Sequence, residues 1–399
     1  MIIQRAYKTK LRLNNKERDV FNRCSGTARY VYNWALADRI EQYRAGSPTN
    51  YYEQKKRFNA LKDELCPWIR EIPYTITESA FRNLDAAYKN FFRRVKQGTE
   101  TPGFPKFKTR GKSPNTFTVR GVRIECDCIR LPSLGWFRLE EHNYLPTGSF
   151  QTNAATISER AGDWFVSIQV EVEIEDRGDR GGVIGVDLGV KSLAVCSDGT
   201  TFDNPHTLVK YERKLARLQR ELSRREKGSN NRAKTRAKIA KLHAKIANTR
   251  AHTQHNISRH VTANTLPEVV VIEDLNIRGM VKNHCLARAV SDASMGELAR
   301  QIEYKAAWNG IEIIRADRWF PSSKTCSRCG CIKDDLTLAD RVFRCDDCGF
   351  EIDRDLNAAR NLAALGEPVS DGGLPVELGP MGSTVKQEAG SVSKTRIEL

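Results

Sequence analysis

Chemistry-bearing residues are concentrated between positions 326 and 361. Two Cys-x-x-Cys pairs, Cys326/Cys329 and Cys345/Cys348, are separated by fifteen residues. Thiolates bind Zn²⁺ tetrahedrally, and each Cys-x-x-Cys turn directs two sulfur atoms at one centre. The spacing therefore predicts a zinc ribbon. Its four thiolates would close the coordination sphere, which makes the zinc structural rather than catalytic. Cys331 lies beside the first pair and is an alternative ligand.

Carboxylates stand at the ends of apolar runs and at the start of a helical run. Asp187 ends VIGVD, Glu273 ends VVVIE, and Asp355 opens a run that continues NAAR. Ligand sites of open α/β sheets collect at strand ends, and a carboxylate at the edge of a buried strand is costly unless it is paired or metal-bound. Clustered carboxylates bind Mg²⁺, and two such ions can clamp the attacking and leaving oxygens of a phosphodiester. We therefore expect the three acids to form one magnesium site.

Each acid also has a structural explanation. Asp353 or Asp355 could be the N-cap of the helix that follows, and Glu273 could form a salt bridge with Arg278. For any one acid this explanation is the simpler one. Three such acids together on a strongly basic chain favour the metal site.

The charge of the chain points to a polyanionic partner. Its 399 residues carry a net charge of +16, and such an excess usually neutralises phosphates; the alternative is an inert basic surface. Between Lys210 and Arg250 there are fifteen Lys or Arg and three Glu. This segment predicts a helical brace on a nucleic-acid duplex, whereas the alternative is a solvated helical hairpin. The candidate contacts in it are Arg213, Lys214, Arg217, Arg220, Arg224 and Arg225.

Periodicity divides the chain into three kinds of segment. Residues 1–13 alternate as a strand, 15–95 are helical, and 115–175 are rich in short strands. A loop at 98–111 combines aromatic rings with cations, including Lys106 and Lys108, as single-stranded nucleic-acid sites do. After a linker at 177–182, strands and helices alternate to residue 362, which predicts an α/β domain.

Several absences also guide the interpretation. Beyond about residue 364 no period remains, and we expect disorder. No run approaches the length of a membrane span, and the first residues lack the apolar core of a signal peptide. Eleven cysteines, an odd number, suit a reducing cytosol better than a disulfide framework.

Four motifs together resemble the TnpB family of bacterial insertion sequences, relatives of the type V CRISPR effectors. They are GVDLGVKSLAV, VIEDLN, the double Cys-x-x-Cys ribbon and DRDLNAARN. The resemblance runs from residue 1 to about 364. It implies an RNase H-like RuvC nuclease domain (182–323 and 352–365) with an inserted zinc ribbon (324–351). It also implies an N-terminal wedge barrel (1–13 and 99–176) interrupted by a helical recognition insert (14–98), with 366–399 as a disordered tail.

The resemblance also implies a function. TnpB-like proteins bind a guide RNA from the transposon end and cut matching double-stranded DNA beside a short adjacent motif. Carried over by position, the catalytic acids are Asp187, Glu273 and Asp355, with Asp353 as second choice, and the zinc ligands are the four paired cysteines. Tyr74 to Glu78, with Thr118, are expected to read the adjacent motif.

We therefore expect an RNA-guided, Mg²⁺-dependent endodeoxyribonuclease in a bacterial or archaeal cytoplasm, leaving a 5′-phosphate and a 3′-hydroxyl. Two alternatives are a nuclease-inactive guided repressor and a guide-independent transposase. The three intact acids argue against the repressor.

Overall fold

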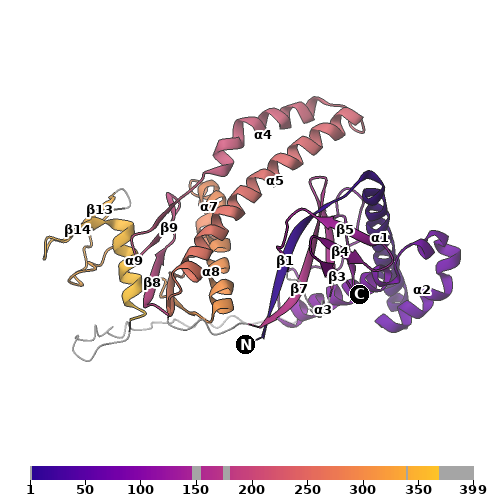
Figure 1. Cartoon of the computed structure of the whole chain (residues 1–399), viewed down its shortest axis with the longest axis horizontal. Helices are drawn as coiled ribbons and strands as arrows, with labels where there is room; N and C mark the ends of the chain where they lie inside the picture. The colour runs from indigo at the N-terminus through magenta and orange to yellow at the C-terminus, as the bar shows by residue number, and fades with distance from the viewer. Residues whose placement is uncertain (1, 146–153, 174–179, 338–339, 368–399) are drawn as a thin grey trace, which may run out of the picture.

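The computed structural model describes residues 2–145, 154–173, 180–337 and 340–367. Figure 1 shows two parts, an N-terminal part built on β1 to β7 and a C-terminal part built on β8 to β12. The expected tail falls almost wholly on residues 368–399, outside the described residues, as do positions 177–179 of the expected linker. No helix of the described chain is long and apolar enough to cross a membrane.

The N-terminal part contains a seven-stranded sheet in the order β2-β6-β7-β1-β5-β4-β3. Its long first strand changes partner along its length, because residues 2–10 pair with β7 and residues 11–12 pair with β5. Every pairing of β1 is antiparallel. The strands are β1 Ile2–Arg12, β2 Thr116–Val119, β3 Arg123–Glu125, β4 Cys128–Leu131, β5 Gly135–Leu139, β6 Ala155–Arg160 and β7 Asp163–Glu173.

Along much of β2 and β4 to β7 every second side chain is apolar and buried, and together these side chains form one core. β7 buries Trp164, Val166, Ile168 and Val170 in turn, and these side chains share a cluster with residues from both ends of the sheet. Phe21 from the first helix makes edge-to-face contacts with Phe117 of β2 and Trp164 of β7 and a tilted contact with Phe137 of β5. The sheet therefore curls around a single apolar interior, although its edge strands β2 and β3 are not paired with each other in the described chain.

Three α-helices and a 3₁₀ turn lie in sequence between β1 and β2. A capping box at Asn14 and Glu17 starts the first helix, and a second one at Asn50 and Glu53 starts the next. Pro67 opens the 3₁₀ turn, in keeping with its fixed backbone angle. The elements are α1 Asn15–Arg44, α2 Tyr51–Leu65, η1 Pro67–Glu71 and α3 Tyr74–Lys96.

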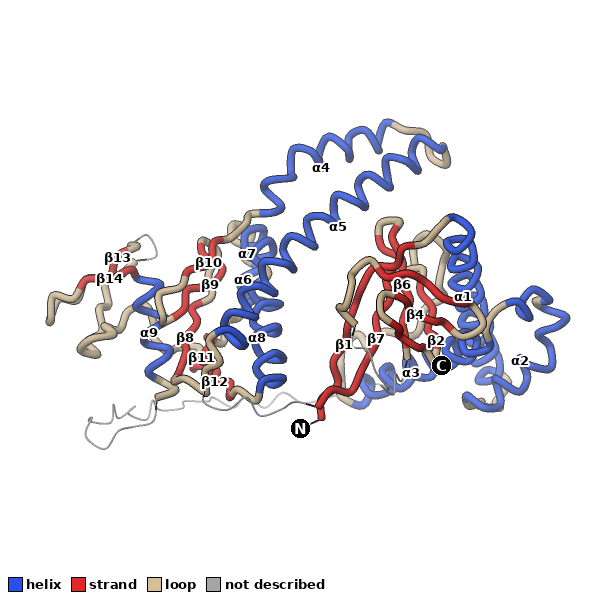
Figure 2. The backbone as a smooth tube through the Cα atoms, viewed as in Figure 1, coloured by secondary structure: helices blue, strands red, loops and turns tan. Residues whose placement is uncertain are grey.

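The C-terminal part is a three-layer α/β structure. Its five-stranded sheet has the order β10-β9-β8-β11-β12, in which β8, β11 and β12 are parallel and β9 is antiparallel to both of its neighbours, β8 and β10. One face packs against α5 and α8 and the other against α9 (Figure 2). The strands are β8 Val183–Asp187, β9 Ser192–Cys196, β10 Thr201–Asp203, β11 Val269–Glu273 and β12 Glu312–Ala316.

A helical hairpin projects from this part of the molecule, formed by α4 and the first half of α5 (Figure 1). Leu218, Leu242 and Ile246 join its two arms. The α5 helix passes directly into a π-helical turn, η2. The helices are α4 Thr207–Arg224, α5 Asn230–Arg259, η2 His260–Asn264, α6 Ile277–Lys282, α7 Ala287–Ala293, α8 Met295–Asn309 and α9 Arg354–Ala364.

The segment between β12 and α9 contains little regular structure. Its two short strands, β13 Val342–Arg344 and β14 Glu351–Asp353, form an antiparallel pair. Phe343 is fully buried against two of the paired cysteines, Cys326 and Cys345. With so small an apolar cluster, this segment needs another source of stability, such as a bound metal.

Candidate metal centre and active site

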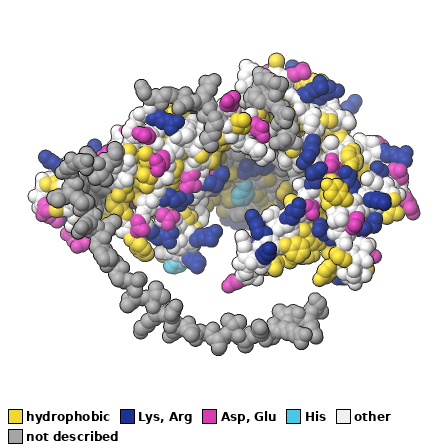
Figure 3. Space-filling model, turned by 90° about the horizontal axis from the view of Figure 1, so that it is seen from below, with side chains coloured by type: hydrophobic (Ala, Val, Ile, Leu, Met, Phe, Trp, Pro, Cys, Tyr) yellow, Lys and Arg dark blue, Asp and Glu magenta, His cyan; other side chains and the backbone are white. Residues whose placement is uncertain are grey.

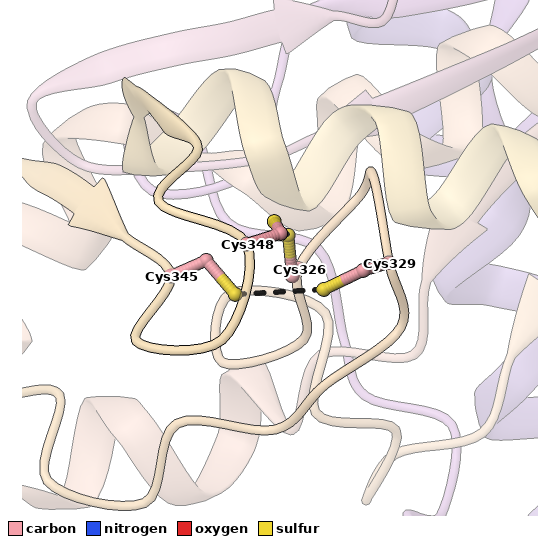
Figure 4. A group of neighbouring side chains, drawn as sticks. All are labelled: Cys326, Cys329, Cys345 and Cys348. Carbon is pink, nitrogen blue, oxygen red and sulfur yellow. Dashed lines mark hydrogen bonds between the residues drawn. The ribbon is translucent and has the colours of Figure 1, made fainter.

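The four paired cysteines converge (Figure 4). Their sulfur atoms all lie within 4.8 Å of one another, and no other group of three or more His, Cys, Asp or Glu in the described ranges meets that limit. The Cys326 and Cys348 sulfurs are 3.7 Å apart, and those of Cys329 and Cys345 are 3.5 Å apart. Thiolates arranged tetrahedrally at about 2.3 Å from a zinc ion would be about 3.8 Å apart. The cluster therefore has the dimensions of a metal site.

The spare cysteine, Cys331, lies outside this cluster, because its thiol donates to the carboxylate of Asp347. Backbone hydrogen bonding, chiefly from Cys348, lowers the pKa of Cys345 to about 7, whereas hydrogen bonds to other thiols of the cluster, together with burial, raise the pKa values of Cys329 and Cys348. A thiol that ionises near neutral pH is ready to become a metal ligand. All eleven cysteines of the chain are free of disulfides.

The three predicted acids come from three elements and interact with each other. Asp187 ends β8, Glu273 ends β11, and Asp355 lies in the first turn of α9. The pKa of Asp187 is raised to about 8, chiefly by burial and then by the negative charges of Glu273 and Asp355. Burial also raises the pKa of Glu273. A buried carboxyl group whose ionisation is opposed by neighbouring acids has the environment expected of a ligand for a divalent cation.

An arginine lies among these acids. The guanidinium of Arg354 is 3.1 Å from the Asp355 carboxylate, and its positive charge lowers the pKa of Asp187. The Arg354 side chain also donates to the carbonyl of Thr337 in the ribbon segment, at 3.4 Å. One cation therefore partly neutralises the cluster and links it to the ribbon. In the described chain the three carboxylates are not all within 4.8 Å of one another.

Hydrogen bonds distinguish the two aspartates of the DRD sequence. Asp353 is the N-cap of α9, and its carboxylate accepts from the backbone N–H groups of Asp355 at 2.9 Å and Leu356 at 3.1 Å. Asp355 does not cap the helix, and its negative charge raises the pKa of Asp187 more than the charge of Asp353 does. The capping explanation thus applies to Asp353.

For Glu273, the described ion pairs include none with Arg278. Its carboxylate instead accepts a hydrogen bond of 2.6 Å from the Ser322 hydroxyl.

Close packing brings α9 to the site. Gly185 lies in the middle of β8, where a Cβ atom would be 2.0 Å from the Ala359 carbonyl oxygen and 2.4 Å from the Ala363 nitrogen. Only glycine allows the helix to cross the strand this closely. Asp355, one turn before Ala359 on α9, is thereby held beside Asp187, two residues after Gly185 on β8.

The ribbon is attached to the same helix by two buried asparagines. Asn357 donates to the carbonyl of Thr325 and accepts from the N–H of Ser327, at 2.6 and 3.0 Å. Asn361, one turn later, donates to the carbonyls of Ser322 and Thr325. Neither asparagine was predicted from the sequence as a site residue, and neither were Arg354 and Ser322. For the two asparagines the available signal was their spacing of four residues in NAARN, which puts both side-chain amides on one face of the helix.

The cationic residues predicted on the hairpin lie on α4. Arg213, Arg217 and Arg220 are exposed, as are Lys214 and Arg224. Lys214 and Arg217 line a cavity of about 400 Å³ between α4 and α5, together with Lys238, Lys241 and Lys245 of the opposite arm. Arg225 differs from this group, because Glu221 binds its guanidinium at 2.5 Å.

The predicted contacts in the N-terminal part are dispersed. Lys106 is exposed, whereas the Lys108 ammonium lies 4.0 Å from the centre of the Tyr32 ring, and burial lowers its pKa. Tyr74 is exposed at the start of α3. Glu78 accepts from Tyr51 at 3.1 Å and from Arg82 at 3.0 Å. The hydroxyl of Thr118 on β2 lies 3.5 Å from that of Thr156.

Three family models match the chain. One described as "Probable transposase" of the OrfB/IS605 group matches residues 167–284, and a second, the TNB domain of Cas12f1-like proteins, matches 296–362. A "Helix-turn-helix domain" model of the same OrfB group matches 1–47, where the structure has a strand followed by one long helix. A Streptomyces pristinaespiralis protein named "Putative RNA-guided DNA endonuclease" is 35% identical over 374 residues, covering 91% of this chain and 90% of that protein. The chain belongs to the OrfB/TnpB family.

Two further relatives and one solved structure are also similar to this TnpB-family chain. The Escherichia coli protein named "Putative RNA-guided DNA endonuclease InsQ" is 33% identical over 406 residues, covering 96% of both chains. The "CRISPR-associated endodeoxyribonuclease Cas12f1" of Sulfoacidibacillus thermotolerans is 30% identical over 54% of each chain. A solved Cas12f1-sgRNA-target DNA complex contains a protein chain with the same overall fold, with a TM-score of 0.53 at 14% identity, covering 91% of this chain and 99% of that one.

Proposed function

We propose that this protein is an RNA-guided, Mg²⁺-dependent DNA endonuclease of an insertion sequence, acting in the cytoplasm on double-stranded DNA that matches a transposon-derived guide RNA. The observation that carries the proposal is that Asp187 is buried close enough to Glu273 and Asp355 to feel their charges: burial chiefly, and then these two acids, raise its pKa to about 8. Relatives that match nearly the whole chain bear the name RNA-guided DNA endonuclease.

The domain organisation belongs to the same proposal. The mixed sheet β8–β12, with acids at two strand ends and one helix start, supports an RNase H-like RuvC domain over 182–323 and 352–365. The shared core of the seven-stranded sheet supports a wedge barrel over 1–13 and 99–176, and α1 to α3 support a recognition insert over 14–98. Residues 324–351 are proposed as the zinc ribbon.

The donor atoms at both centres fit the proposed metals. The four cysteines would hold a structural Zn²⁺, as their 3.5 and 3.7 Å sulfur spacings support. The three carboxylates are oxygen donors, as Mg²⁺ prefers, and they would hold two Mg²⁺ ions. Bound there, the ions would supply charge stabilisation to the attacking and leaving oxygens of a phosphodiester.

The protein's own groups prepare the reaction. Ser322 fixes the orientation of the Glu273 carboxylate through its 2.6 Å hydrogen bond. Arg354 holds the Asp355 carboxylate and offsets part of the repulsion among the acids. Once ionised, the acids orient a water molecule for in-line attack on phosphorus, and the products carry a 5′-phosphate and a 3′-hydroxyl. The basic face of α4 would hold the nucleic acid by its phosphates.

The test is cleavage of DNA that matches the co-purifying RNA. Asp187→Ala and Asp355→Asn are each expected to reduce the cleavage rate by at least a thousandfold, on the order of 4 kcal/mol, and to keep RNA and target binding. Asp353→Ser is the matched control, because serine preserves the helix cap without the charge, so its rate should stay within a few-fold of wild type. Undiminished cutting by Asp187→Ala would remove this acid from the site.

The same assay separates the rival functions. A guided repressor would bind matching DNA without cutting it in Mg²⁺. A guide-independent transposase would process transposon ends after the RNA has been removed, so dependence of cutting on the RNA excludes it.

A further inference from the structure

A second charged site lies where the two parts of the molecule meet. A cavity of about 330 Å³, here called the junction pocket, is lined by Arg5 of β1 and by His255, Arg259, Lys305 and Trp308 of the C-terminal part. Figure 3 shows the molecule hollowed between its two parts, with Lys and Arg side chains around the hollow. None of these residues takes part in the nuclease mechanism above.

The pocket gathers positive charge without a protein counter-ion. The Lys305 ammonium donates to the carbonyl of His255 at 3.0 Å and to the hydroxyl of Ser258 at 2.7 Å. Both acceptors are neutral, and an ammonium has three donors. Within the described chain no carboxylate forms an ion pair with Lys305, Arg259 or Arg5. Glu297, whose charge acts on His255 of the pocket, is already bound by Arg300 at 2.6 Å.

Arg5 reaches the pocket from the other part of the molecule. Its guanidinium lies 4.4 Å from the centre of the Trp308 ring, an arrangement that fixes a planar cation. Its Nε atom is buried and has no hydrogen-bond partner in the described chain. A buried donor without an acceptor is costly, so an acceptor oxygen that reached this atom would remove that cost.

The cations of the junction pocket repel one another when no anion is bound. Burial, followed by the charges of Arg259 and Arg5, lowers the pKa of Lys305 to about 8. The π-helical turn η2 begins one residue after Arg259, and such turns frequently lie at functional sites. An anion with several acceptor oxygens would relieve this repulsion, and a phosphodiester fits the guanidinium and ammonium donors.

The position of the pocket separates it from the acids. The α8 helix ends at Asn309, and the carbonyl of its C-cap residue Gly310 accepts from Arg180, which precedes β8 by three residues. The pocket therefore lies near the end of the sheet where β8 begins, whereas Asp187 lies where β8 ends. A phosphate in the junction pocket is held and not cut.

We propose that the junction pocket binds one backbone phosphate of the RNA, with Arg5 contributed by the N-terminal part and Arg259 and Lys305 by the C-terminal part. The RNA strand thereby ties the two parts together. The inference rests on the proposed function only in taking RNA as the strand that stays bound.

The first measurement is the affinity of RNA-free protein for the RNA that co-purifies with it, as a function of salt concentration. Arg259→Gln and Lys305→Met are each expected to weaken binding about three- to tenfold and to lower the slope of log affinity against log salt by about 0.7 to 0.9, as for one lost phosphate contact. The conservative variant Lys305→Arg should keep most of the RNA affinity and most of the slope against salt. Lys16→Met, which removes an exposed lysine at the start of α1, is the matched control and should change neither. Unchanged affinity and slope in Arg259→Gln, whose exposed side chain the fold does not need, would overturn the proposal.

A double-mutant cycle tests whether both parts hold the same phosphate. Arg5→Gln and Arg259→Gln together should lose less affinity than the product of the two single losses, because removing either residue already disrupts the shared contact. If the affinity loss of the double variant equals the product of the two single losses, Arg5 and Arg259 contact separate phosphates, and the proposed shared contact is rejected.

The source of the phosphate is tested with a DNA duplex that matches the RNA, offered to RNA-loaded protein. Variants that bind RNA normally but lose affinity for this duplex would assign the pocket to DNA and contradict the proposal. Cleavage is not measured in either binding assay. A wild-type protein that binds RNA through the pocket but never cuts DNA would therefore refute the proposed function alone.

Discussion

Asp187 is the residue whose ionisation most depends on its surroundings. Its pKa rises from 3.8 to about 8 because burial and two neighbouring acids oppose its negative charge. Folding therefore favours the protonated form, and the contribution of Asp187 to the free energy of unfolding of the metal-free protein falls as the pH rises from about 4 to about 8. A divalent cation would reverse this preference by pairing with the ionised form.

This reversal predicts a pH-dependent affinity for Mg²⁺. Binding should release about one proton below pH 8, so the apparent affinity should fall by up to tenfold for each pH unit below 8 and level off above it. Calorimetry in buffers of different ionisation enthalpy measures the released proton. The Asp187→Asn variant supplies the control, since it has no proton to release at this position. Proton release equal to that of the wild type in this variant would assign the titration to another group.

Some site residues could be inferred from sequence because their chemistry requires a fixed spacing. The four cysteines follow a ligand pattern, and the spare Cys331 was separated from them only by its contact with Asp347. The assignment of the acids remains a prediction, to which the structure adds the pKa of Asp187 and the cap at Asp353. Arg354 could not be inferred, because a basic residue beside an acid has many possible partners in a sequence.

At the scale of elements, the contact between α9 and β8 determines where Asp355 lies. Gly185→Ala is expected to destabilise the protein by about 3 kcal/mol or more, because the added methyl group would overlap the helix backbone. The nuclease activity of the folded variant should also fall, since α9, which carries Asp355, must move away from Asp187. Chemical denaturation and cleavage rates measure the two effects.

Gly181→Ala is the control for this packing effect, because a Cβ atom at Gly181 would have no neighbour within 4 Å. Equal stability of the two variants would show that α9 does not need the close approach.

The ribbon is the element most dependent on metal. Cys329→Ser should abolish zinc binding and increase amide hydrogen exchange in residues 324–337 and 340–351, while β8 and β11 stay protected, because the ribbon has only a small apolar cluster of its own. Cys331→Ser should keep one zinc per chain, since Cys331 lies outside the cluster. Zinc content by elemental analysis and hydrogen exchange by mass spectrometry provide the measurements. A full zinc complement in Cys329→Ser would contradict the ligand assignment.

Elements with strong periodicity were predictable, and the curvature of the sheet was not. The helical segments at 15–95 and 210–250 and the apolar strands at 183–187 and 269–273 agree with the sequence-based expectations. The change of partner along β1, from β7 to β5, depends on pairing between residues more than a hundred positions apart. No local pattern encodes such a pairing, and the barrel therefore stays a proposal.

For the whole molecule, the net charge of +16 has two opposite consequences. Raising the salt concentration should raise the melting temperature of RNA-free protein by a few degrees, because screening reduces repulsion between cations. The same salt should weaken RNA binding, because it competes for the phosphates. Thermal unfolding with and without the co-purifying RNA distinguishes the two effects. A melting temperature that falls with salt in the RNA-free protein would mean that its ion pairs outweigh its repulsion.

The order of the acids along the chain also has a consequence during synthesis. Asp187 and Glu273 are translated well before Asp355, which reaches its place only when α9 packs over Gly185. A nascent chain shorter than 355 residues therefore already contains its N-terminal sheet and the basic hairpin proposed to bind nucleic acid, while its proposed nuclease centre is still incomplete. We expect that such a chain could bind RNA before it could cut DNA.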